Sequence, residues 1–231
     1  MAEDIFRACT ENVKYLKKQR NRILVMANKA LRDNNNAELE SITTLYALLY
    51  SAYVEVSFLK LIHTPHAFEE AEICQMMTGS VSEKWTKCLE LSLKKIRSKD
   101  NLGKIANKKQ DLSRYLNKYI IQPSQMRNKV AHGQWKVCLN TDCTKINLDT
   151  TNEIKNLDFV KIDRLFSIYE KFQQCMVDLA LSPRTHYRDY YTIITELDNY
   201  ISETESWSIE SKRQVLQNSP KTKRRKQNHP A

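Results

Sequence analysis

The chain has very few of the residues that break regular structure: 3 glycines and 5 prolines among 231 residues. Domains built only from β-strands need many tight turns, which these residues supply. Their scarcity argues against an all-β domain and favours long helices. Charged residues make up 28% of the chain and hydrophobic residues 41%, a balance typical of a globular protein.

Long apolar runs are also lacking. Residues 1–7 (MAEDIFR) are polar and lead into a charged stretch, which is unlike a signal peptide. The longest uncharged run near the centre, residues 41–54, ends at Glu55 and is too short to span a bilayer. We therefore expect a cytoplasmic protein with no membrane partner.

The cysteines do not form a metal-binding pattern. Six are present: Cys9, Cys74, Cys88, Cys138, Cys143 and Cys175. Most lie within expected helices, where a reduced cysteine behaves as a small apolar residue. Cys138 and Cys143 are close enough to meet across a turn, but a zinc site needs two more ligands at short spacing, and none is nearby. We expect reduced thiols, no metal and no cofactor.

The net charge of +10 is concentrated at the C-terminal end. Seven of the 37 basic residues lie in residues 211–231, without an acid, which leaves 30 basic against 27 acidic residues in the rest. A basic tail binds phosphate backbones, acts as a localisation patch or only raises solubility. We expect residues 209–231 to form a disordered tail. Its candidate RNA-contacting residues are Lys221, Lys223, Arg224, Arg225 and Lys226.

Apolar periodicity predicts helices along most of the chain. They cover about residues 3–32, 37–63, 65–77, 81–98, 108–132, 157–181 and 185–205. Asparagines in RDNNNAE should end the first helix and cap the second, and Pro123 should bend or interrupt the fifth. Residues 134–149 alternate apolar and polar side chains around a turn, which predicts a β-hairpin. We expect one all-α domain over residues 1–208, a bundle of about six to seven helices with this hairpin.

One segment, QMRNKVAHGQW at residues 125–135, combines several polar groups at an expected helix end. At about 100° per residue, Asn128 and His132 share a helix face, while Arg127 points about 140° away from His132. A long arginine side chain can wrap back toward that face or reach a site shared with a second chain. Gly133 fits the left-handed position that commonly ends a helix.

These residue types suit RNA cleavage in which the ribose 2′-hydroxyl attacks the adjacent phosphate. Histidine takes or gives a proton near neutrality, an arginine fork binds phosphate oxygens, and an amide such as Asn128 orients either group. Alternatively, His132 only interacts with the last helix carbonyls, and Arg127 pairs with an acid such as Glu55. The spacing alone is not specific, because Arg224 and His229 repeat it in the tail.

A helical chain with Arg-Asn-x-x-x-His-Gly near the end of a late core helix resembles the HEPN superfamily. The resemblance covers about residues 1–205. It implies an α-helical bundle, usually dimeric, in which the motifs of two protomers face each other across a two-fold cleft. Many members are metal-independent endoribonucleases that leave cyclic phosphate ends and act as toxins or in antiviral defence.

The resemblance implies that Arg127 and His132 are the catalytic pair and Asn128 the supporting polar residue. It also implies that Glu55 is a further polar group facing the site, and that the partners are RNA, a second copy of the chain, and an antitoxin or defence-system protein. Lys129 is a candidate RNA contact. The alternative is a non-catalytic HEPN-like helical module that binds RNA or protein, or a purely structural interaction protein.

One branch of the superfamily departs from this sequence. It carries a tyrosine two residues after the histidine, which a nucleotidyltransferase antitoxin modifies. Gln134 occupies that position here and Trp135 follows it, so we do not expect this mode of regulation. Trp135 is expected to anchor the hairpin on the body or to form one wall of the cleft.

Overall fold

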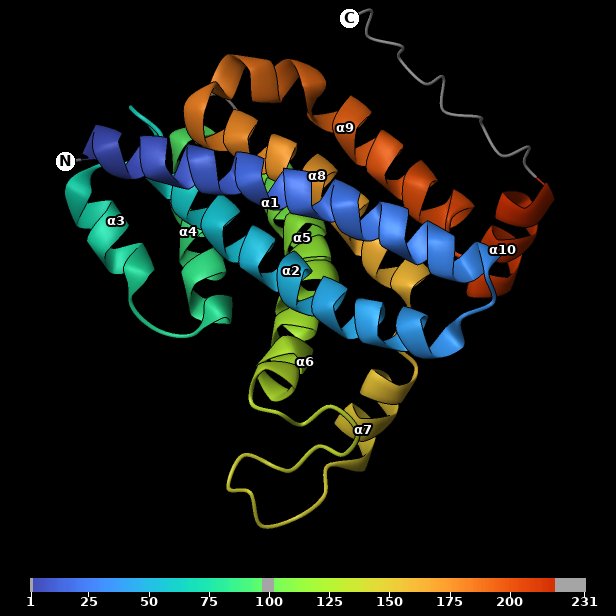
Figure 1. The fold of residues 1–231 in the computed structure, drawn as a ribbon. Coiled ribbons are helices and arrows are strands. Elements are labelled where there is room, and N and C mark those ends of the chain that lie inside the picture. The colour runs from blue at the N-terminus through green and yellow to red at the C-terminus, as the bar shows by residue number, and fades with distance from the viewer. Residues whose placement is uncertain (1, 97–101, 219–231) are drawn as a thin grey trace, which may run out of the picture.

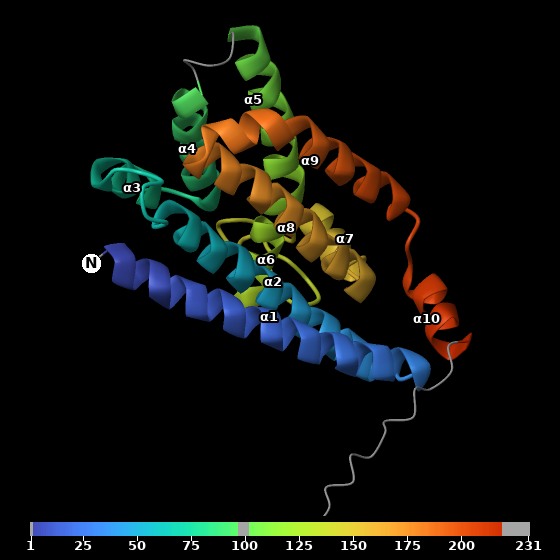
Figure 2. The same cartoon turned by 90° about the horizontal axis from the view of Figure 1, so that it is seen from above.

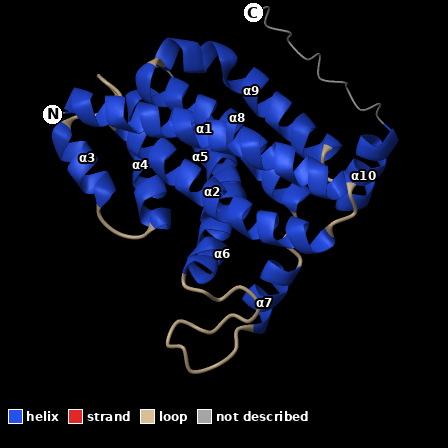
Figure 3. Ribbon diagram, viewed as in Figure 1, coloured by secondary structure: helices blue, strands red, loops and turns tan. Residues whose placement is uncertain are grey.

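A computed structural model describes residues 2–96 and 102–218 and, within these ranges, only the backbone of residues 2, 125–127 and 183. The described part is an all-α bundle, which confirms the expected fold class (Figure 3). Its elements are α1 (Ala2–Arg32), α2 (Asn36–Ile62), α3 (Glu70–Met77), α4 (Val81–Ile96), α5 (Leu102–Leu116), a π-helical turn (Asn117–Ile121), α6 (Gln122–Ala131), α7 (Leu148–Lys155), α8 (Phe159–Leu181), α9 (Pro183–Glu203) and α10 (Ile209–Asn218).

Two helical hairpins form the main body. Helices α1 and α2 lie side by side and antiparallel, and α8 packs on α2 with α9 returning along it (Figure 1). The turn between α1 and α2 is the expected asparagine turn, in which the side chain of Asn35 accepts a hydrogen bond from the backbone N–H of Glu38 at 3.1 Å. Seen from above, the first turns of α5 stand out from this body beside α4 (Figure 2).

The core between α2 and α8 is aromatic. Tyr46, Tyr50 and Tyr53 are each at most 4% exposed. Their ring centroids lie 4.9, 5.0 and 5.5 Å from that of Phe166, distances at which aromatic pairs attract beyond their area burial. Leu45, Leu48 and Leu49 form a neighbouring leucine stripe on α2, but it is not the core face, since Leu45 is 55% exposed. The tyrosines are buried because their hydroxyls find partners inside the bundle.

A partly buried ionic network joins α1 to these tyrosines. The guanidinium of Arg20 donates to Asp163 at 3.0 Å and to Glu170 at 3.2 Å, both on α8. Tyr46 donates to Asp163 at 2.8 Å and Tyr53 to Glu170 at 3.2 Å. Since each carboxylate and hydroxyl is paired, their burial does not leave an uncompensated charge.

Helix α2 is the described helix that is long and apolar enough to cross a membrane by length and composition, with half of its most apolar window buried. The sequence analysis considers only the uncharged run of residues 41–54 within this helix, which is too short to span a bilayer. Tyr46, Tyr50 and Tyr53 of α2 are buried and hydrogen-bonded within the bundle, so α2 is a core helix of the described part.

Two expectations from the sequence are wrong. The hairpin over residues 134–149 is reduced to one antiparallel bridge between Leu139 and Ile146 within a long loop, and the described residues contain no strand (Figure 3). Side chains take two backbone donors that a ladder would need: Cys138 N–H bonds to the hydroxyl of Thr151 at 2.9 Å, and Lys145 N–H bonds to the side-chain oxygen of Asn140 at 3.1 Å.

The second correction concerns residues 209–231, expected as a disordered tail. Residues 209–218 form α10, which packs on the end of α1 (Figure 1). Ile209 and Leu216 pack against the core, and Arg32 donates to the Leu216 carbonyl at 3.3 Å. The remaining tail, with its candidate RNA contacts, lies outside the described residues.

Candidate functional site

Helix α6 carries the RNxxxH segment, and a buried tyrosine holds its start. Pro123 has no N–H, so the carbonyl of Tyr119, its ordinary partner one turn earlier, loses that donor. Tyr50 on α2 donates its hydroxyl to this carbonyl at 2.7 Å. Burial raises the pKa of Tyr50, which keeps the hydroxyl protonated as a donor. The expected interruption is present as the π-helical turn (Asn117–Ile121) directly before Pro123, through which α5 continues into α6.

The C-terminal end of α6 is closed by a Schellman motif. Gly133, at φ +79°, donates its N–H to the Val130 carbonyl at 3.1 Å, and Gln134 donates to the Lys129 carbonyl at 2.9 Å. The indole N–H of Trp135 also donates to the Val130 carbonyl, at 2.7 Å. This confirms the role expected for Gly133 and fixes His132 as the last residue before the chain reverses.

The expected pair on one face of α6 is present. Asn128 and His132 are both exposed, and the backbone N–H of His132 donates to the Asn128 carbonyl at 3.1 Å. The backbone of Arg127 lies in α6, while its side chain lies outside the described part, so its expected approach to His132 stays a prediction. The structure thus leaves both side chains exposed at the C-terminal end of α6.

Two other polar residues of the segment hold the following loop. The ammonium of Lys129, a candidate RNA contact, donates to the Leu139 carbonyl at 2.8 Å, and Gln134 uses its side-chain oxygen on Leu139 N–H. Both residues therefore fix the loop over residues 134–147 against the end of α6. A rigid support of this kind keeps the functional side chains of a helix end in place.

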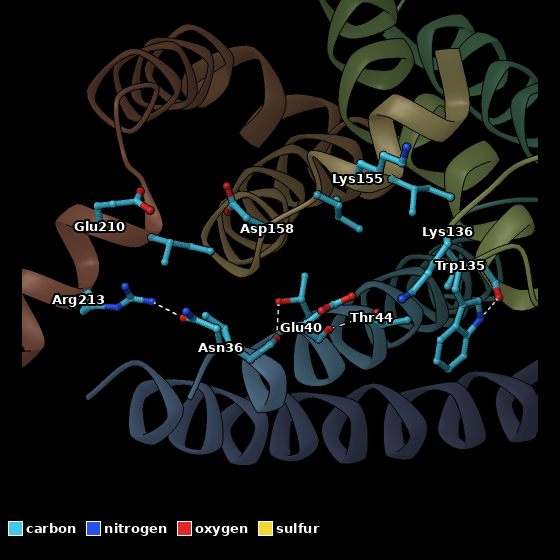
Figure 4. Close-up of a pocket in the computed structure, with 15 residues that line it drawn as sticks. Asn36, Glu40, Thr44, Trp135, Lys136, Lys155, Asp158, Glu210 and Arg213 are labelled. Carbon is cyan, nitrogen blue, oxygen red and sulfur yellow. Dashed lines mark hydrogen bonds between the residues drawn. The ribbon is translucent and has the colours of Figure 1, made fainter. Parts of the chain in front are cut away.

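A cleft of about 600 Å³ opens beside the helix end (Figure 4). Trp135 and Val130 form one wall, so Trp135 both anchors the loop and lines the cleft. The opposite wall comes from α10, where Arg213 donates to the side-chain oxygen of Asn36 at 2.8 Å. The charged residues of the lining balance one another: Lys136, Lys155 and Arg213 against Glu40, Asp158 and Glu210. A phosphate backbone would meet no excess of positive charge here.

Glu55 on α2 is exposed. It lines a smaller cavity of about 130 Å³ between α2, α4 and α6. Ser124 of α6 lines the same cavity, one helical turn before Asn128. The role of Glu55 as a further polar group of the site stays a prediction.

The large cleft is not predicted by the sequence analysis, because two of the helices that line it are not among the expected elements. Helices α7 and α10 contribute Ile154, Lys155, Ile209 and Arg213 to the large cleft. The signal for α10 was Ser208 followed by Ile209 and Leu216 at helical spacing.

All six cysteines are free thiols, four of them buried. Among the described residues no group of three His, Cys, Asp or Glu side chains could hold a metal ion.

Comparison of the chain with protein-family models, with curated proteins and with solved structures finds no match in any of the three. The residues and their geometry alone therefore support a functional proposal.

Proposed function

We propose that the protein is a HEPN-type, metal-independent endoribonuclease that acts in the cytoplasm as a toxin or antiviral defence effector. The observation that supports this most directly is the exposed pair of Asn128 and His132 at the capped end of α6. A histidine buried for packing would point into the bundle. His132 is instead exposed, one helical turn after Asn128. Hydrogen bonds hold both ends of the helix that carries them, α6.

The proposed reaction is transesterification. The ribose 2′-oxygen bonds to phosphorus, the bond from phosphorus to the 5′-oxygen breaks, and a 2′,3′-cyclic phosphate remains. His132 takes the proton of the 2′-hydroxyl or gives one to the leaving oxygen, which typically contributes about 10²–10⁴-fold to rate. Arg127 binds the phosphate oxygens as negative charge develops, and Asn128 orients the imidazole or the phosphate.

A homodimer fits the open position of this pair. The end of α6 and its loop project below α2, away from the α8–α9 hairpin (Figure 1), so a second copy can approach without disturbing the core. In such a dimer each site would combine Arg127, Asn128 and His132 of both chains. A composite site of this kind would also exclude the water that a single exposed helix end admits.

The test is cleavage of total RNA in EDTA by the wild type, Arg127→Ala and His132→Ala, with the product ends mapped. We expect cyclic phosphate ends from the wild type and at least about a hundredfold slower cleavage by either variant. His66, which lies in the turn after α2, gives a matched control, because His66→Ala also removes an exposed histidine. Equal cleavage by all proteins would place the activity elsewhere or in a contaminant.

A failure to cleave would favour the non-catalytic module. RNA binding by the intact His132→Ala dimer then becomes the discriminating measurement, because a binding module keeps its affinity when the imidazole is removed.

A further inference from the structure

We infer that the first turns of α9, together with α5 beside them, form a second RNA-binding surface on which Tyr187 and Tyr191 stack two bases of a single strand. Figure 2 shows α9 passing beside α5. This inference rests on the proposed function for the identity of the ligand as RNA. It deepens that function, because it separates the place where the substrate is held from the place where it is cleaved.

The cleft beside the motif gives an RNA strand no electrostatic anchor. Its charged lining is balanced, and the ammonium of Lys129 is used on the Leu139 carbonyl. Contacts with phosphates supply most of the nonspecific affinity of proteins for nucleic acids. Residues 219–231 carry basic side chains but no Phe, Tyr or Trp on which a base could stack. An anchor that holds both phosphates and bases must therefore lie elsewhere.

The sequence is basic where α5 and α9 meet. Residues 102–110 of α5 contain three lysines and no acid, and residues 183–188 of α9 contain two arginines and no acid. Asp111 and Asp189 follow these ranges, one on each helix. Positive charge therefore exceeds negative charge in these first turns, unlike in the cleft.

Two of these cations pair with acids at the surface. Arg188 donates to Asp189 at 2.6 and 2.7 Å, and Lys109 donates to Glu90 on α4 at 2.8 Å. We therefore assign the phosphate contact to Arg184, which is exposed and lies one turn before Tyr187 and Arg188. Residues three and four apart are neighbours on a helix surface, so its guanidinium is within reach of a strand that stacks on Tyr187.

Tyr187 and Tyr191 are the aromatic part of this surface. They lie one turn apart on α9 and are 50% and 61% exposed. Because residues at this spacing share a helix face, both rings are accessible from the same side. Single exposed hydrophobic residues are common on protein surfaces. An adjacent aromatic pair beside basic residues is instead the arrangement on which single-stranded nucleic acids stack, since every base has a π-face.

Neighbouring side chains hold the two rings in place. The ammonium groups of Lys104 and Lys108 on α5 lie 6.0 and 5.6 Å from the centre of the Tyr187 ring. Tyr191 packs edge-on against the buried Tyr190, with ring centroids 5.2 Å apart. A ring that is already held loses little conformational freedom when a base stacks on it. The surface is therefore pre-organised for stacking.

The surface and the motif lie far apart on one continuous helical rod. Helix α5 continues through the π-helical turn into α6, and from Lys104 to His132 the rod rises about 42 Å at about 1.5 Å per residue. A long RNA can contact both places at once. A short oligonucleotide that occupies the motif cannot reach the tyrosines.

The experiment measures binding of a fluorescein-labelled oligouridine of about 20 nucleotides, longer than the site size of a typical single-strand-binding domain, by fluorescence anisotropy. The parent protein carries His132→Ala so that the strand stays intact. Tyr187→Leu and Tyr191→Leu should each weaken binding at least about fivefold, the loss expected from removing one base–aromatic stack. Tyr187→Phe keeps the ring and should keep the affinity. Tyr15→Leu is the matched control, because Tyr15 on α1 is 62% exposed.

The phosphate contact is tested by the dependence of the affinity on salt. Arg184→Gln should reduce the slope of log K against log salt concentration by about 1, the effect of one lost phosphate contact. Arg22→Gln, which changes an exposed arginine of α1, should leave the slope unchanged.

Photocrosslinking of the parent protein to an oligonucleotide that contains 5-iodouridine gives a result that does not depend on the folding of a variant. The crosslinked peptides should include Tyr187 or Tyr191. Crosslinks confined to other peptides would overturn the inference. So would a failure to bind the oligouridine, which would leave the surface to a protein partner, or equal affinities of Tyr191→Leu, Tyr15→Leu and the parent.

The two proposals fail separately, because the binding assay needs no cleavage. Binding that depends on Tyr187 and Tyr191, in a protein whose wild type cleaves no RNA, would sink the proposed ribonuclease alone. Cleavage of long RNA by the wild type that Tyr187→Leu and Tyr191→Leu leave unaltered would sink the second surface alone.

Discussion

Replacing Tyr50 by phenylalanine tests whether this tyrosine holds the helix that carries the motif. The hydroxyl donates to the Tyr119 carbonyl at 2.7 Å, in place of the N–H that Pro123 lacks. Removing one partner of a buried hydrogen bond costs about 1–3 kcal/mol, because the other partner stays desolvated. For a chain of 231 residues, each kcal/mol lowers the melting temperature by about 2–4 °C.

Equilibrium unfolding in urea, followed by circular dichroism, measures this loss. Tyr53→Phe on the same helix is the control. Its partner Glu170 is also paired with Lys17 at 3.0 Å and is partly exposed, so we expect a loss of about 1 kcal/mol or less. Pro123→Ala completes the design, since it restores an N–H that can bond to the Tyr119 carbonyl.

The double variant gives the decisive result. Tyr50→Phe should cost clearly less in the Pro123→Ala background than in the wild type, with a coupling energy of about 1 kcal/mol. Strict additivity, or equal losses for Tyr50→Phe and Tyr53→Phe, would refute the view that this hydroxyl replaces the missing helix bond.

Three further predictions follow from the same structure. Gly133→Ala should lower the free energy of unfolding by about 1 kcal/mol, because φ is +79° but the new Cβ meets no atom within 4 Å. Gly79→Ala should cost more, since its Cβ would displace the Glu83 carboxylate, which accepts hydrogen bonds from the N–H and the hydroxyl of Ser80. Burial raises the pKa of Cys88 and of Cys175 to about 12. A disulfide reagent should therefore label the exposed Cys74 and Cys143 rapidly, and should label Cys88 and Cys175 only after unfolding. The stability that comes from keeping these buried thiols protonated is fully present below pH 9.0 and should be lost as the pH rises toward about 12. Removing residues 219–231 should flatten the salt dependence of RNA binding without lowering the melting temperature, whereas removing residues 209–231 should lower it, because α10 packs on the core.

Local signals predicted the helices and the end of the motif helix. The asparagine turn after α1 and the glycine after His132 are fixed by hydrogen bonds within a few residues, so the sequence pattern was sufficient there. Which face of α2 is buried could not be predicted, because the partners of Tyr46 and Tyr53 lie more than a hundred residues away on α8. The tyrosine and leucine stripes are neighbours with similar spacing.

The β-hairpin predicted over residues 134–149 is wrong for a different reason. Ile146 and Leu148 alternate with polar residues as in a strand, but they are 58% and 67% exposed, and Asn147 between them caps α7 by accepting from Thr150 N–H. At the site, the exposed pair was predictable from helix periodicity. The cavities beside it depend on helices that meet only in the folded chain.

The π-helical turn before Pro123 has a consequence for the orientation of the motif. In this turn the N–H of Gln122 bonds to the Asn117 carbonyl, five residues back, so the turn holds one residue more than an α-helix would. Because the turn takes up this extra residue, Asn128 and His132 face the direction that they would have in a regular helix one residue shorter. If the same residues were wound as a regular α-helix without the π-helical turn, everything after them would be rotated by about 100° and shifted by about 1.5 Å, while α5 kept its packing. The direction in which the motif points thus depends on the π-helical turn, separately from the residues of the motif itself.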